Sequence, residues 1–284
     1  MRKTEFAITD EYSGRTVGDI LKSKLCISSR LLTLLKRSGG ILLDGKSVTV
    51  RETVTCGQIL SLEIRDELPS ENIVPVKMPL DILYEDEDIL AVSKPHNMPI
   101  HPSAYNYDNT LGNAVMYHFA ARPFVYRPIT RLDRDTTGVV LIAKNKLSAA
   151  LLTDLMTEKK ITKTYIALLS AIPLPLCGTV EAPIGRCADS VIKREVSQNG
   201  KHALTHYKVI GINSDGTCVA RLNPVTGRTH QIRVHMAHIG CPLMYDFLYG
   251  KEQNGKSFVL HCESLEFPHP VTGEKTVIIS KKDI

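Results

Sequence analysis

Aromatic residues are scarce in this sequence: they make up 6% of its 284 positions, and tryptophan is absent. Enzymes that hydrolyse carbohydrates rely on aromatic platforms to hold sugar rings, so this composition argues against that class. No stretch approaches the roughly 18 uninterrupted apolar residues of a transmembrane helix. Segment 1–10 lacks the apolar centre of a secretory signal. We therefore expect a soluble protein of the cytoplasm with no membrane partner.

The sequence lacks the motifs that bind a structural zinc ion or a nucleotide cofactor. The seven cysteines form no C-x-x-C pair and have no histidine at zinc-finger spacing, which argues against a structural zinc site. An odd number of scattered cysteines is typical of a reducing compartment rather than of a disulfide framework. A G-x-G-x-x-G or P-loop sequence is also missing, so no nucleotide cofactor is expected.

The length and the linker composition predict two domains. A chain of 284 residues that is 43% hydrophobic can bury one large core and a second, smaller one. Residues 66–79 hold three prolines among mixed charges, which is typical of a linker. We expect a small N-terminal domain at 1–70, a linker at 71–79 and a larger domain at 80–284. A monomer is the expected state.

The N-terminal 70 residues have the pattern of two helices followed by strands. Thr16 and Asp19 form a capping box for a first helix. A second helix is expected to begin at Ser28 or Ser29 and to end at Gly39-Gly40. Strand patterns follow in segments 41–43, 46–48 and 58–64.

The positive charge of the protein is concentrated in this region. Residues 15–51 include eight basic and two acidic side chains, and eight minus two gives a local charge of +6, against +5 for the whole chain. This region resembles the small RNA-binding domain named after ribosomal small-subunit protein four, which implies RNA contacts from its basic residues. The expected contacts are Lys22, Arg30, Lys36 and Arg37. A solvated basic face on a packing domain is the alternative.

Residues 80–284 contain more strand patterns than helix patterns. Helical spacing occurs at 110–118 and 147–158. Strand patterns occur at 82–84, 89–92, 139–143, 165–169, 206–210, 218–222 and 258–261. Because strands and helices do not alternate regularly, we expect an α+β fold with a mixed, largely antiparallel sheet.

The densest group of reactive side chains is Arg131-Leu132-Asp133-Arg134-Asp135-Thr136-Thr137-Gly138, directly before the apolar strand 139–143. Asp133 lies between two arginines on a loop that enters a buried strand, so it can stay ionised while partly desolvated. Such a carboxylate suits a nucleophile or a charge stabiliser. A structural ion-pair network is the alternative for these residues taken alone.

A second polar cluster is Gly227-Arg228-Thr229-His230-Gln231-Ile232-Arg233-Val234-His235. In a strand, Thr229, Gln231 and Arg233 would share one face, whereas a helix would bring His230 and Arg233 together. Both arrangements gather hydrogen-bond donors that suit an anionic backbone. The two histidines have no carboxylate or cysteine at ligand spacing, so no metal site is expected.

Three segments together resemble a known enzyme family. Lys163-Thr164-Tyr165 opens a β-forming run, where a tyrosine alone is more often a core residue than a catalyst. In chain order, however, Arg131-Leu132-Asp133, Lys163-Thr164-Tyr165 and 227–235 resemble the signature segments of the RluA-type pseudouridine synthases. The likeness extends from about Leu80 to the C-terminus through Lys94-Pro95, His101-Pro102, Gly240-Cys241-Pro242, Asp246, Tyr249-Gly250, Leu260-His261 and 267–273.

The resemblance implies an RNA-modifying enzyme that isomerises uridine to pseudouridine, with large-subunit ribosomal RNA as the expected substrate and transfer RNA as the alternative. It implies that Asp133 is the catalytic aspartate and that Arg233 is its basic partner. Tyr165 would stack on the base and serve as general base, and Arg131 would hold the flipped-out nucleotide or fill its place. The other expected substrate contacts are Thr136, Arg228, His230 and Gln231.

Three positions depart from the pattern of that family. Thr130 stands where histidine is common, Thr137 where serine is usual, and Tyr245 where glycine commonly precedes the aspartate matched by Asp246. The change at Thr130 could alter how the flipped nucleotide is held. The change at Thr137 keeps the hydroxyl.

The implied reaction breaks the bond between the base nitrogen and the sugar and rejoins the base through carbon 5. It involves no redox change and no group transfer, so it needs no cofactor. Asp133 could attack the sugar, stabilise its cationic character or remove a sugar proton, and the sequence leaves these routes open. Two other functions remain as alternatives: a non-catalytic RNA-binding protein of this fold, and a carbohydrate hydrolase that uses Asp133 and Asp135.

Overall fold

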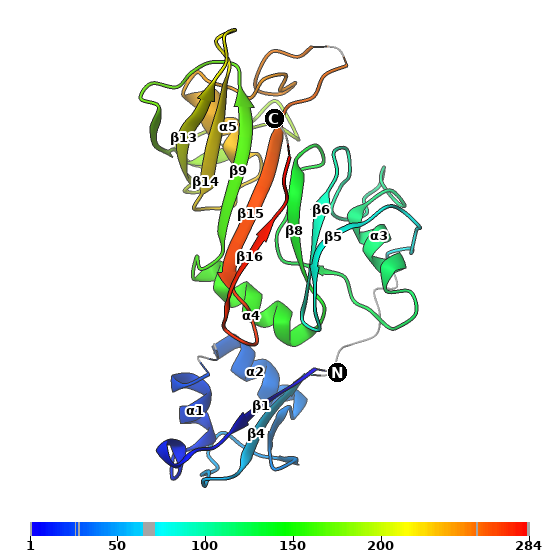
Figure 1. Ribbon diagram of the computed structural model, residues 1–284, viewed down its shortest axis with the longest axis vertical. Helices are drawn as coiled ribbons and strands as arrows, with labels where there is room; N and C mark the ends of the chain where they lie inside the picture. Colours follow the sequence, from blue (N-terminus) through cyan, green and yellow to red (C-terminus); the bar gives the residue numbers. More distant parts are fainter. Residues whose placement is uncertain (1, 26, 28, 65–71, 254, 283–284) are drawn as a thin grey trace.

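The computed structural model describes residues 2–25, 27, 29–64, 72–253 and 255–282 (Figure 1). Its N-terminal unit, residues 2–64, is a four-stranded antiparallel sheet packed against two helices. The sheet order is β1 (Arg2–Ala7), β4 (Ile59–Ile64), β2 (Ile41–Leu43) and β3 (Lys46–Ser47). The helical segments are the 3-10 helix η1 (Asp10–Tyr12), α1 (Val17–Ser23) and α2 (Ser29–Ser38). The predicted helices and strands 41–64 are confirmed, whereas β1 was not predicted because this polar edge strand has no alternating apolar pattern.

Helix α1 begins where the sequence predicts. Asp19 N donates to Thr16 Oγ1 at 3.2 Å, and Thr16 N donates to Asp19 Oδ2 at 3.3 Å. This reciprocal pair satisfies two backbone donors that a helix start otherwise leaves open. The predicted capping box is therefore confirmed.

The rest of the chain is built around one ten-stranded sheet. Its order is β10 (Cys177–Glu181), β13 (Leu204–Ile212), β14 (Cys218–Pro224), β9 (Thr162–Leu169), β15 (Leu260–Pro268), β8 (Thr137–Ala143), β6 (Ile89–Lys94) and β5 (Asp81–Glu85), with β16 (Lys275–Ile279) on β15 and β7 (Arg127–Pro128) on β8. Strands β8 and β15 run parallel, and the other pairs among the described strands are antiparallel. The predicted α+β fold with a mixed, largely antiparallel sheet is confirmed.

Three helices and a small hairpin complete this part. The helices are α3 (Leu111–His118), α4 (Lys146–Thr157) and α5 (Gln231–His238), and the hairpin joins β11 (Ile184–Arg186) to β12 (Arg194–Val196). The strand predicted at 258–261 begins instead at Leu260 and continues to Pro268. Within the described part of the chain, no helix is long and apolar enough to cross a membrane.

Helix α4 connects the two sheets through opposite faces. Leu147 is 1% exposed and belongs to the core of the N-terminal unit, with Ala150 and Leu151 packed beside it. Leu152 is fully buried in the core of the large sheet. Figure 1 shows α4 lying between the large sheet and α2. Because each face buries apolar side chains, the N-terminal unit is docked on the larger body.

A close approach between β8 and β15 sets the loop that precedes β8. Gly138 has a φ of +107°, and a Cβ atom there would lie 2.2 Å from the carbonyl oxygen of Cys262. Only glycine fits this position, because any side chain would collide with the backbone of β15. Loop 131–136 is therefore held against the first residues of β15, above the centre of the sheet.

Candidate active site

A pocket of about 370 Å³ opens where the two polar clusters of the sequence meet. One wall comes from the loop before β8 and the other from the start of α5, with β9 between them. The lining residues are Ile129 to Asp133, Thr136, Met156, Lys163, Tyr165, Pro224, Thr226 to Arg233 and Leu260. Its volume lies in the range of sites that enclose a small ligand. The fold thus joins segments almost one hundred residues apart into one cavity.

Asp133 faces Arg233 and His230, which come from elsewhere in the sequence. Its Oδ2 lies 3.9 Å from Arg233 Nη1 and 3.9 Å from His230 Nε2. The neighbouring Arg134 turns away to pair with Asp135 at 3.1 Å. Arg134, one of the two arginines that flank Asp133 in the sequence, therefore bonds Asp135 instead, because adjacent side chains on this loop point in different directions. The Asp133 carboxylate is 31% exposed and is open to the pocket.

Arg233 is held by a second carboxylate and by aromatic rings. Its Nε and Nη2 donate to Asp246 at 2.7 and 2.8 Å, and both residues are at most 2% exposed. The guanidinium also lies over the rings of Phe258, Tyr249 and Phe247, at 4.5, 5.0 and 5.4 Å from their centroids. A bidentate pair of this kind fixes the guanidinium plane, and Nη1 remains directed toward Asp133. The pairing of Arg233 with Asp246 was not predicted.

His230 is the N-cap of α5 in a left-handed conformation, with a φ of 57°. Non-glycine residues adopt this conformation at a cost, and it is common at functional sites. The hydroxyl of Tyr249 lies 2.9 Å from His230 Nδ1. Burial lowers the pKa of His230. The negative charge of Asp133 raises this pKa, and the positive charge of Arg233 lowers it. Neutral imidazole is therefore favoured beside the aspartate.

Tyr165 lies on β9 between Leu222 of β14 and Cys262 of β15. It is 8% exposed and lines the pocket. Burial raises the pKa of Tyr165 well above its ordinary value, and Cys262 and Asp133 raise it further. The phenol therefore stays protonated, so any proton that it accepts must be relayed through its neutral hydroxyl or a bound water.

Comparison with known proteins identifies the family. Residues 88–238 match the family model described as RNA pseudouridylate synthase. A Bacillus subtilis (strain 168) protein named "Uncharacterized RNA pseudouridine synthase YjbO" is 40% identical over 257 residues, which cover 88% of this chain and 90% of that protein. The chain belongs to the RNA pseudouridylate synthase family.

Further relatives agree with this membership. The "Ribosomal large subunit pseudouridine synthase D" of Haemophilus influenzae is 37% identical over 269 residues, which cover 87% of this chain and 80% of that protein. The solved structure titled "Human RNA Pseudouridylate Synthase Domain Containing 1" has a TM-score of 0.62 and 28% identity, and the match covers 72% of this chain and 84% of that one. The predicted RluA-type membership and RNA pseudouridine synthase activity are confirmed.

The three departures from the pattern of this synthase family have structural explanations. Thr130 accepts a hydrogen bond from Leu141 N at 2.9 Å, so its hydroxyl serves the sheet. Thr137 Oγ1 lies 2.8 Å from His261 Nδ1, a contact that needs only the hydroxyl. Tyr245 has a φ of 64°, the region that favours glycine, and its ring and hydroxyl both contact Lys256 Nζ.

Two predicted substrate contacts of the synthase are engaged with protein groups. Gln231 is 4% exposed, and its amide bonds with Thr226 and Arg228 on one side and with Leu204 and Thr205 on the other. This saturation favours a role in shaping the loop over RNA binding. The exposed Arg228 donates through Nε to His202 O at 2.9 Å but lines the pocket.

The structure adds a pocket residue that the sequence reasoning missed. Lys163 is half-buried, and burial lowers its pKa. Among the described residues, no carboxylate lies within ion-pair distance of its Nζ. Thr136 lies nearby in the lining and is 2% exposed, and its Oγ1 has no hydrogen-bond partner. The position of Lys163 in the motif Lys163-Thr164-Tyr165 was the only signal for it. Both groups are suited to a polar, anionic ligand.

The predicted RNA contacts of the N-terminal unit lie outside the pocket. Lys22 is exposed on α1, and Lys36 and Arg37 are exposed in the last turn of α2. The side chain of Arg30 lies outside the described part of the chain. Met156 of α4 lines the pocket, whereas Leu147 at the other end of α4 packs on the N-terminal unit. One helix thus links the pocket to that unit.

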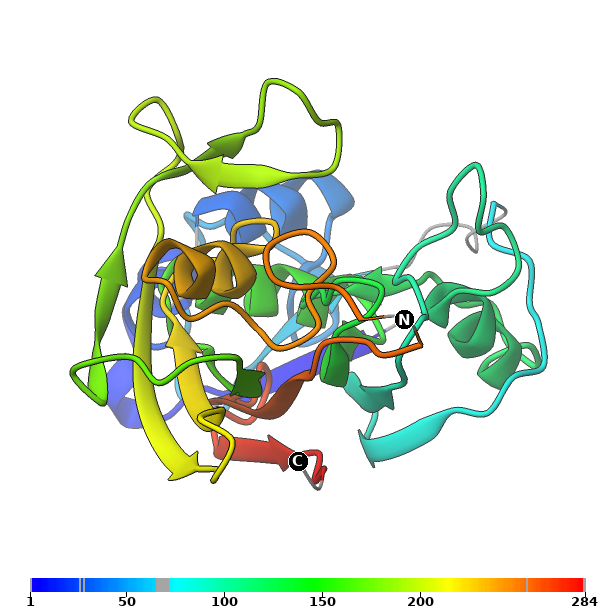
Figure 2. The same cartoon turned by 90° about the horizontal axis from the view of Figure 1, so that it is seen from above.

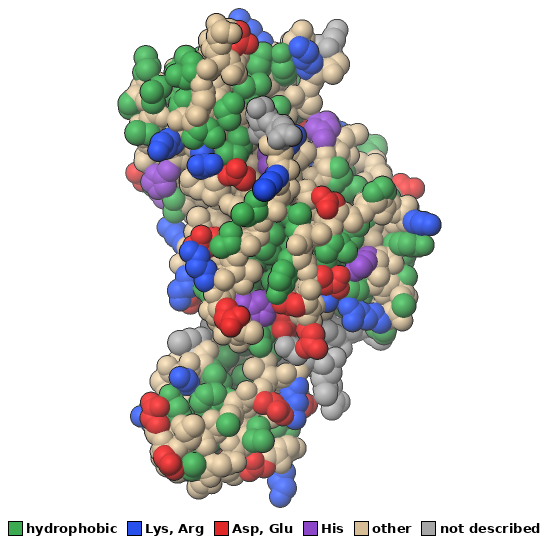
Figure 3. All heavy atoms as spheres, in the orientation of Figure 1, with side chains coloured by type: hydrophobic (Ala, Val, Ile, Leu, Met, Phe, Trp, Pro, Cys, Tyr) green, Lys and Arg blue, Asp and Glu red, His purple; other side chains and the backbone are tan. Residues whose placement is uncertain are grey.

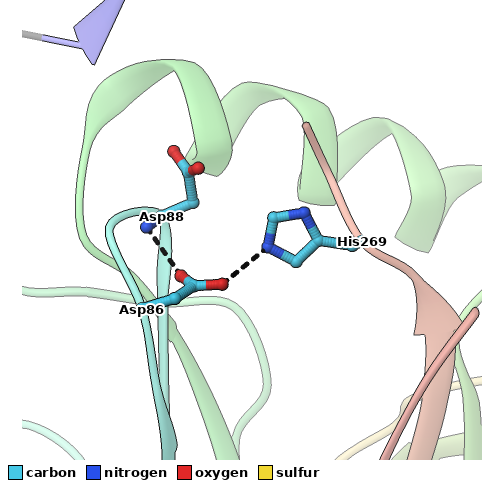
Figure 4. A group of neighbouring side chains, drawn as sticks. All are labelled: Asp86, Asp88 and His269. Carbon is cyan, nitrogen blue, oxygen red and sulfur yellow. Dashed lines mark hydrogen bonds and ion pairs between the residues drawn. The ribbon is translucent and has the colours of Figure 1, made fainter. Parts of the chain in front are cut away.

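Asp86, Asp88 and His269 form another polar cluster (Figure 4). Asp86 accepts hydrogen bonds from Asp88 N at 2.7 Å and Ile89 N at 2.8 Å, and its Oδ2 lies 2.9 Å from His269 Nε2. His269 Nδ1 accepts from two backbone amides of its own turn, at Val271 and Thr272. The ligand atoms of Asp86 and His269 are therefore engaged in hydrogen bonds within the protein, and the cluster ties the β15–β16 turn to the β5–β6 turn.

Lys94 is a buried cation behind the catalytic loop, and it gives a testable pH effect. It is 1% exposed, and its Nζ donates to the carbonyl oxygens of Arg134 at 2.8 Å and Pro95 at 2.9 Å. Burial lowers its pKa from 10.5 to about 8, against the opposing charges of Asp135 and Asp133. Above pH 8 the unfolded chain therefore holds more protons at this site than the folded enzyme does.

We expect the free energy of unfolding of the wild type to rise relative to Lys94→Met as pH increases from 8 to 10. Linkage predicts a change of about 2–3 kcal/mol across this window. Urea unfolding of both proteins at pH 7, 8, 9 and 10 measures the difference. A difference that stays constant with pH would contradict the assignment.

Proposed function

We propose that this enzyme isomerises specific uridines of large-subunit ribosomal RNA, with Asp133 as its catalytic carboxylate. The observation that carries the proposal is the pocket itself, where Asp133 is the carboxylate open to the cavity and faces Arg233 and His230 at 3.9 Å. Relatives named ribosomal large subunit pseudouridine synthase D support the choice of RNA. Transfer RNA is the alternative substrate.

Asp133 acts on the sugar of a uridine that has left its stack. The target base cannot reach a pocket while stacked, so it must be flipped out, at a cost of roughly a few kcal/mol. Arg233 Nη1 lies 3.9 Å from the carboxylate and offers it a positive charge. The carboxylate can then attack the anomeric carbon, stabilise its positive charge or remove a sugar proton.

Other pocket residues bind and guide the base. We assign Tyr165 to stacking on the uracil and to relaying the carbon 5 proton, and Arg131 to the space that the flipped base leaves. Thr136, with its unpaired hydroxyl, and the half-buried Lys163 would bind polar edges of the nucleotide or its phosphate. The reaction as proposed needs no metal and no nucleotide cofactor. We place the enzyme in the cytoplasm as a monomer.

The N-terminal unit supplies additional binding to RNA in this proposal. On the face drawn in Figure 3, the unit carries acidic as well as basic side chains. We therefore assign the contact to the exposed Lys36 and Arg37 at the end of α2, not to the whole unit. Phosphate contacts of this kind release counterions and make binding depend on salt.

Reversing both charges in Lys36→Glu/Arg37→Glu is expected to raise KM for RNA about tenfold and to leave kcat unchanged. The slope of log affinity against log salt should become shallower by about 1–2, since each phosphate contact contributes roughly 0.7–0.9. Lys208→Glu/Lys281→Glu, two exposed lysines of the larger body, is the matched control. Equal effects of the two double variants would show that net charge matters, not this site.

Mapping pseudouridine in RNA tests the proposed function. Ribosomal and transfer RNA from cells that lack the gene would be incubated with the enzyme, and carbodiimide-dependent stops of reverse transcriptase would locate the modified uridines. Stops confined to large-subunit ribosomal RNA support the proposal. Stops only in transfer RNA would transfer the assignment to that substrate, and RNA binding without any stop on either RNA would contradict both.

A further inference from the structure

The segment between β6 and α3 presents a fully exposed aromatic side chain. Ser103 and Asn106 exchange two backbone hydrogen bonds of 3.0 Å each, which closes a two-residue turn at Ala104 and Tyr105. Tyr105 is 96% exposed, and Tyr107, two residues on, is 63% exposed. In Figure 2 this segment projects past α3, away from the sheet. Large aromatic side chains are seldom left so open to water, because their faces gain from contact.

Hydrogen bonds within the segment and to α3 hold this turn, so the exposure of Tyr105 follows from the fold. Asn109 Nδ2 donates to Asn106 Oδ1 at 3.2 Å. Asn113, which is fully buried on α3, donates through Nδ2 to the carbonyl oxygen of Tyr107 at 3.0 Å. The backbone on both sides of the turn is therefore fixed. A ring presented in this way loses little conformational freedom when a ligand stacks on it.

The turn lies beside the catalytic loop. Met98 N donates to Arg134 O at 3.1 Å, and the ring of His101 packs edge-on against Tyr126 with centroids 5.3 Å apart. Burial lowers the pKa of His101, and the charge of Arg131 lowers it further. The seven residues from Met98, which is bonded to the catalytic loop, to Tyr105 span at most about 25 Å when fully extended. Tyr105 therefore lies within a few nucleotides of a uridine bound at Asp133.

We propose that Tyr105, supported by Tyr107, is a stacking platform for an unpaired base of the RNA close to the target uridine. The inference rests on the proposed function for the identity of the RNA and for the place of the target uridine at Asp133. Flipping the uridine removes a stacking partner from its neighbours, and an exposed aromatic face replaces that partner without reading the sequence. The basic Arg131, which lines the pocket, would contact the backbone between the two bases.

The absence of tryptophan from the chain allows a direct test. The Tyr105→Trp variant carries a single tryptophan, and stacking on a base should quench the tryptophan emission by more than half when protein-free large-subunit ribosomal RNA transcript is added. Tyr117→Trp, at an exposed tyrosine of α3 that is 45% accessible, is the matched control and should not be quenched. Quenching that is absent or equal in the two variants would overturn the proposal.

Kinetics on the same transcript provide the second measurement. Tyr105→Leu is expected to raise KM about tenfold with kcat within twofold, whereas Tyr105→Phe and Tyr117→Leu should match the wild type. An effect of Tyr105→Phe as large as that of Tyr105→Leu would indicate a hydroxyl contact and overturn stacking. A defect of Tyr105→Leu on assembled ribosomal particles alone would indicate a protein partner and also overturn it. If the wild type leaves this transcript unmodified, the ribosomal assignment fails, and the fluorescence test is repeated with transfer RNA. Quenching of Tyr105→Trp by transfer RNA would then support the stacking platform. No quenching by transfer RNA would overturn it.

Discussion

Asp133→Asn is expected to lower kcat by at least roughly a thousandfold, because an amide can neither attack the sugar nor balance its positive charge, and catalytic groups of this kind contribute factors of that size. The Asp133 side chain is partly exposed, and among the described residues its contacts with Arg233 Nη1 and His230 Nε2 are both as long as 3.9 Å. Its loss should therefore leave the fold intact. Release of tritium from carbon 5 of labelled uridine in RNA measures kcat.

Asp135→Asn is the matched control for this experiment. Asp135 lies two residues along the same loop but pairs with Arg134 at 3.1 Å and with His96 at 3.6 Å. We expect it to retain kcat within about tenfold and to lose some stability, because its carboxylate is structural. If Asp133→Asn keeps more than a tenth of the activity, or if both variants are inactive while folded, Asp133 is not the catalytic group.

Asp246→Asn is expected to destabilise the enzyme by about 3–5 kcal/mol, since it leaves the buried guanidinium of Arg233 without its anionic partner. Arg233 should then turn its free charge onto Asp133, tighten the 3.9 Å contact and lower kcat by roughly a hundredfold. Urea unfolding gives the loss of stability. Turnover at a temperature well below the transition gives the change in kcat.

The double variant Arg233→Met/Asp246→Asn distinguishes the interaction energy of the Arg233–Asp246 pair from the separate contribution of each residue. Because it removes the unpaired charge, it should unfold at a higher urea concentration than Asp246→Asn alone, and the two single effects should fail to add by about 1–3 kcal/mol. Its kcat should stay well below that of the wild type, since Asp133 has lost the guanidinium of Arg233. Strictly additive losses of stability would mean that the two residues do not act as a pair.

Several parts of the molecule could be predicted from local sequence. The capping box at Thr16, the apolar strand 139–143 and the helices at 110–118 and 147–158 follow from spacing and from short-range hydrogen bonding. Each of these signals involves residues within one or two turns of each other. The ordered set of three motifs, from Arg131 to His235, was sufficient to indicate the family.

Other features depend on contacts that no local pattern encodes. Segment 227–235 was compatible with a strand or a helix. The structure places His230 as a left-handed N-cap and starts α5 at Gln231, because the four bonds of the buried Gln231 amide fix the helix start. Sequence neighbours suggested Arg134 as a cation for Asp133, but successive side chains on a loop diverge, and Arg134 bonds Asp135.

The sequence by itself determined the fold class, the family and the residue types that the reaction requires. Tertiary structure decided which of them meet: Arg233 with Asp246 at 2.7 Å and with Asp133 at 3.9 Å, Lys94 behind the catalytic loop, and Lys163 in the pocket. These contacts join β6, β8, β9 and α5. The four elements come together only when β8 pairs with β15 in the sheet. Local propensity acts over a few residues, whereas such charge contacts depend on distances set by the packing of the whole sheet.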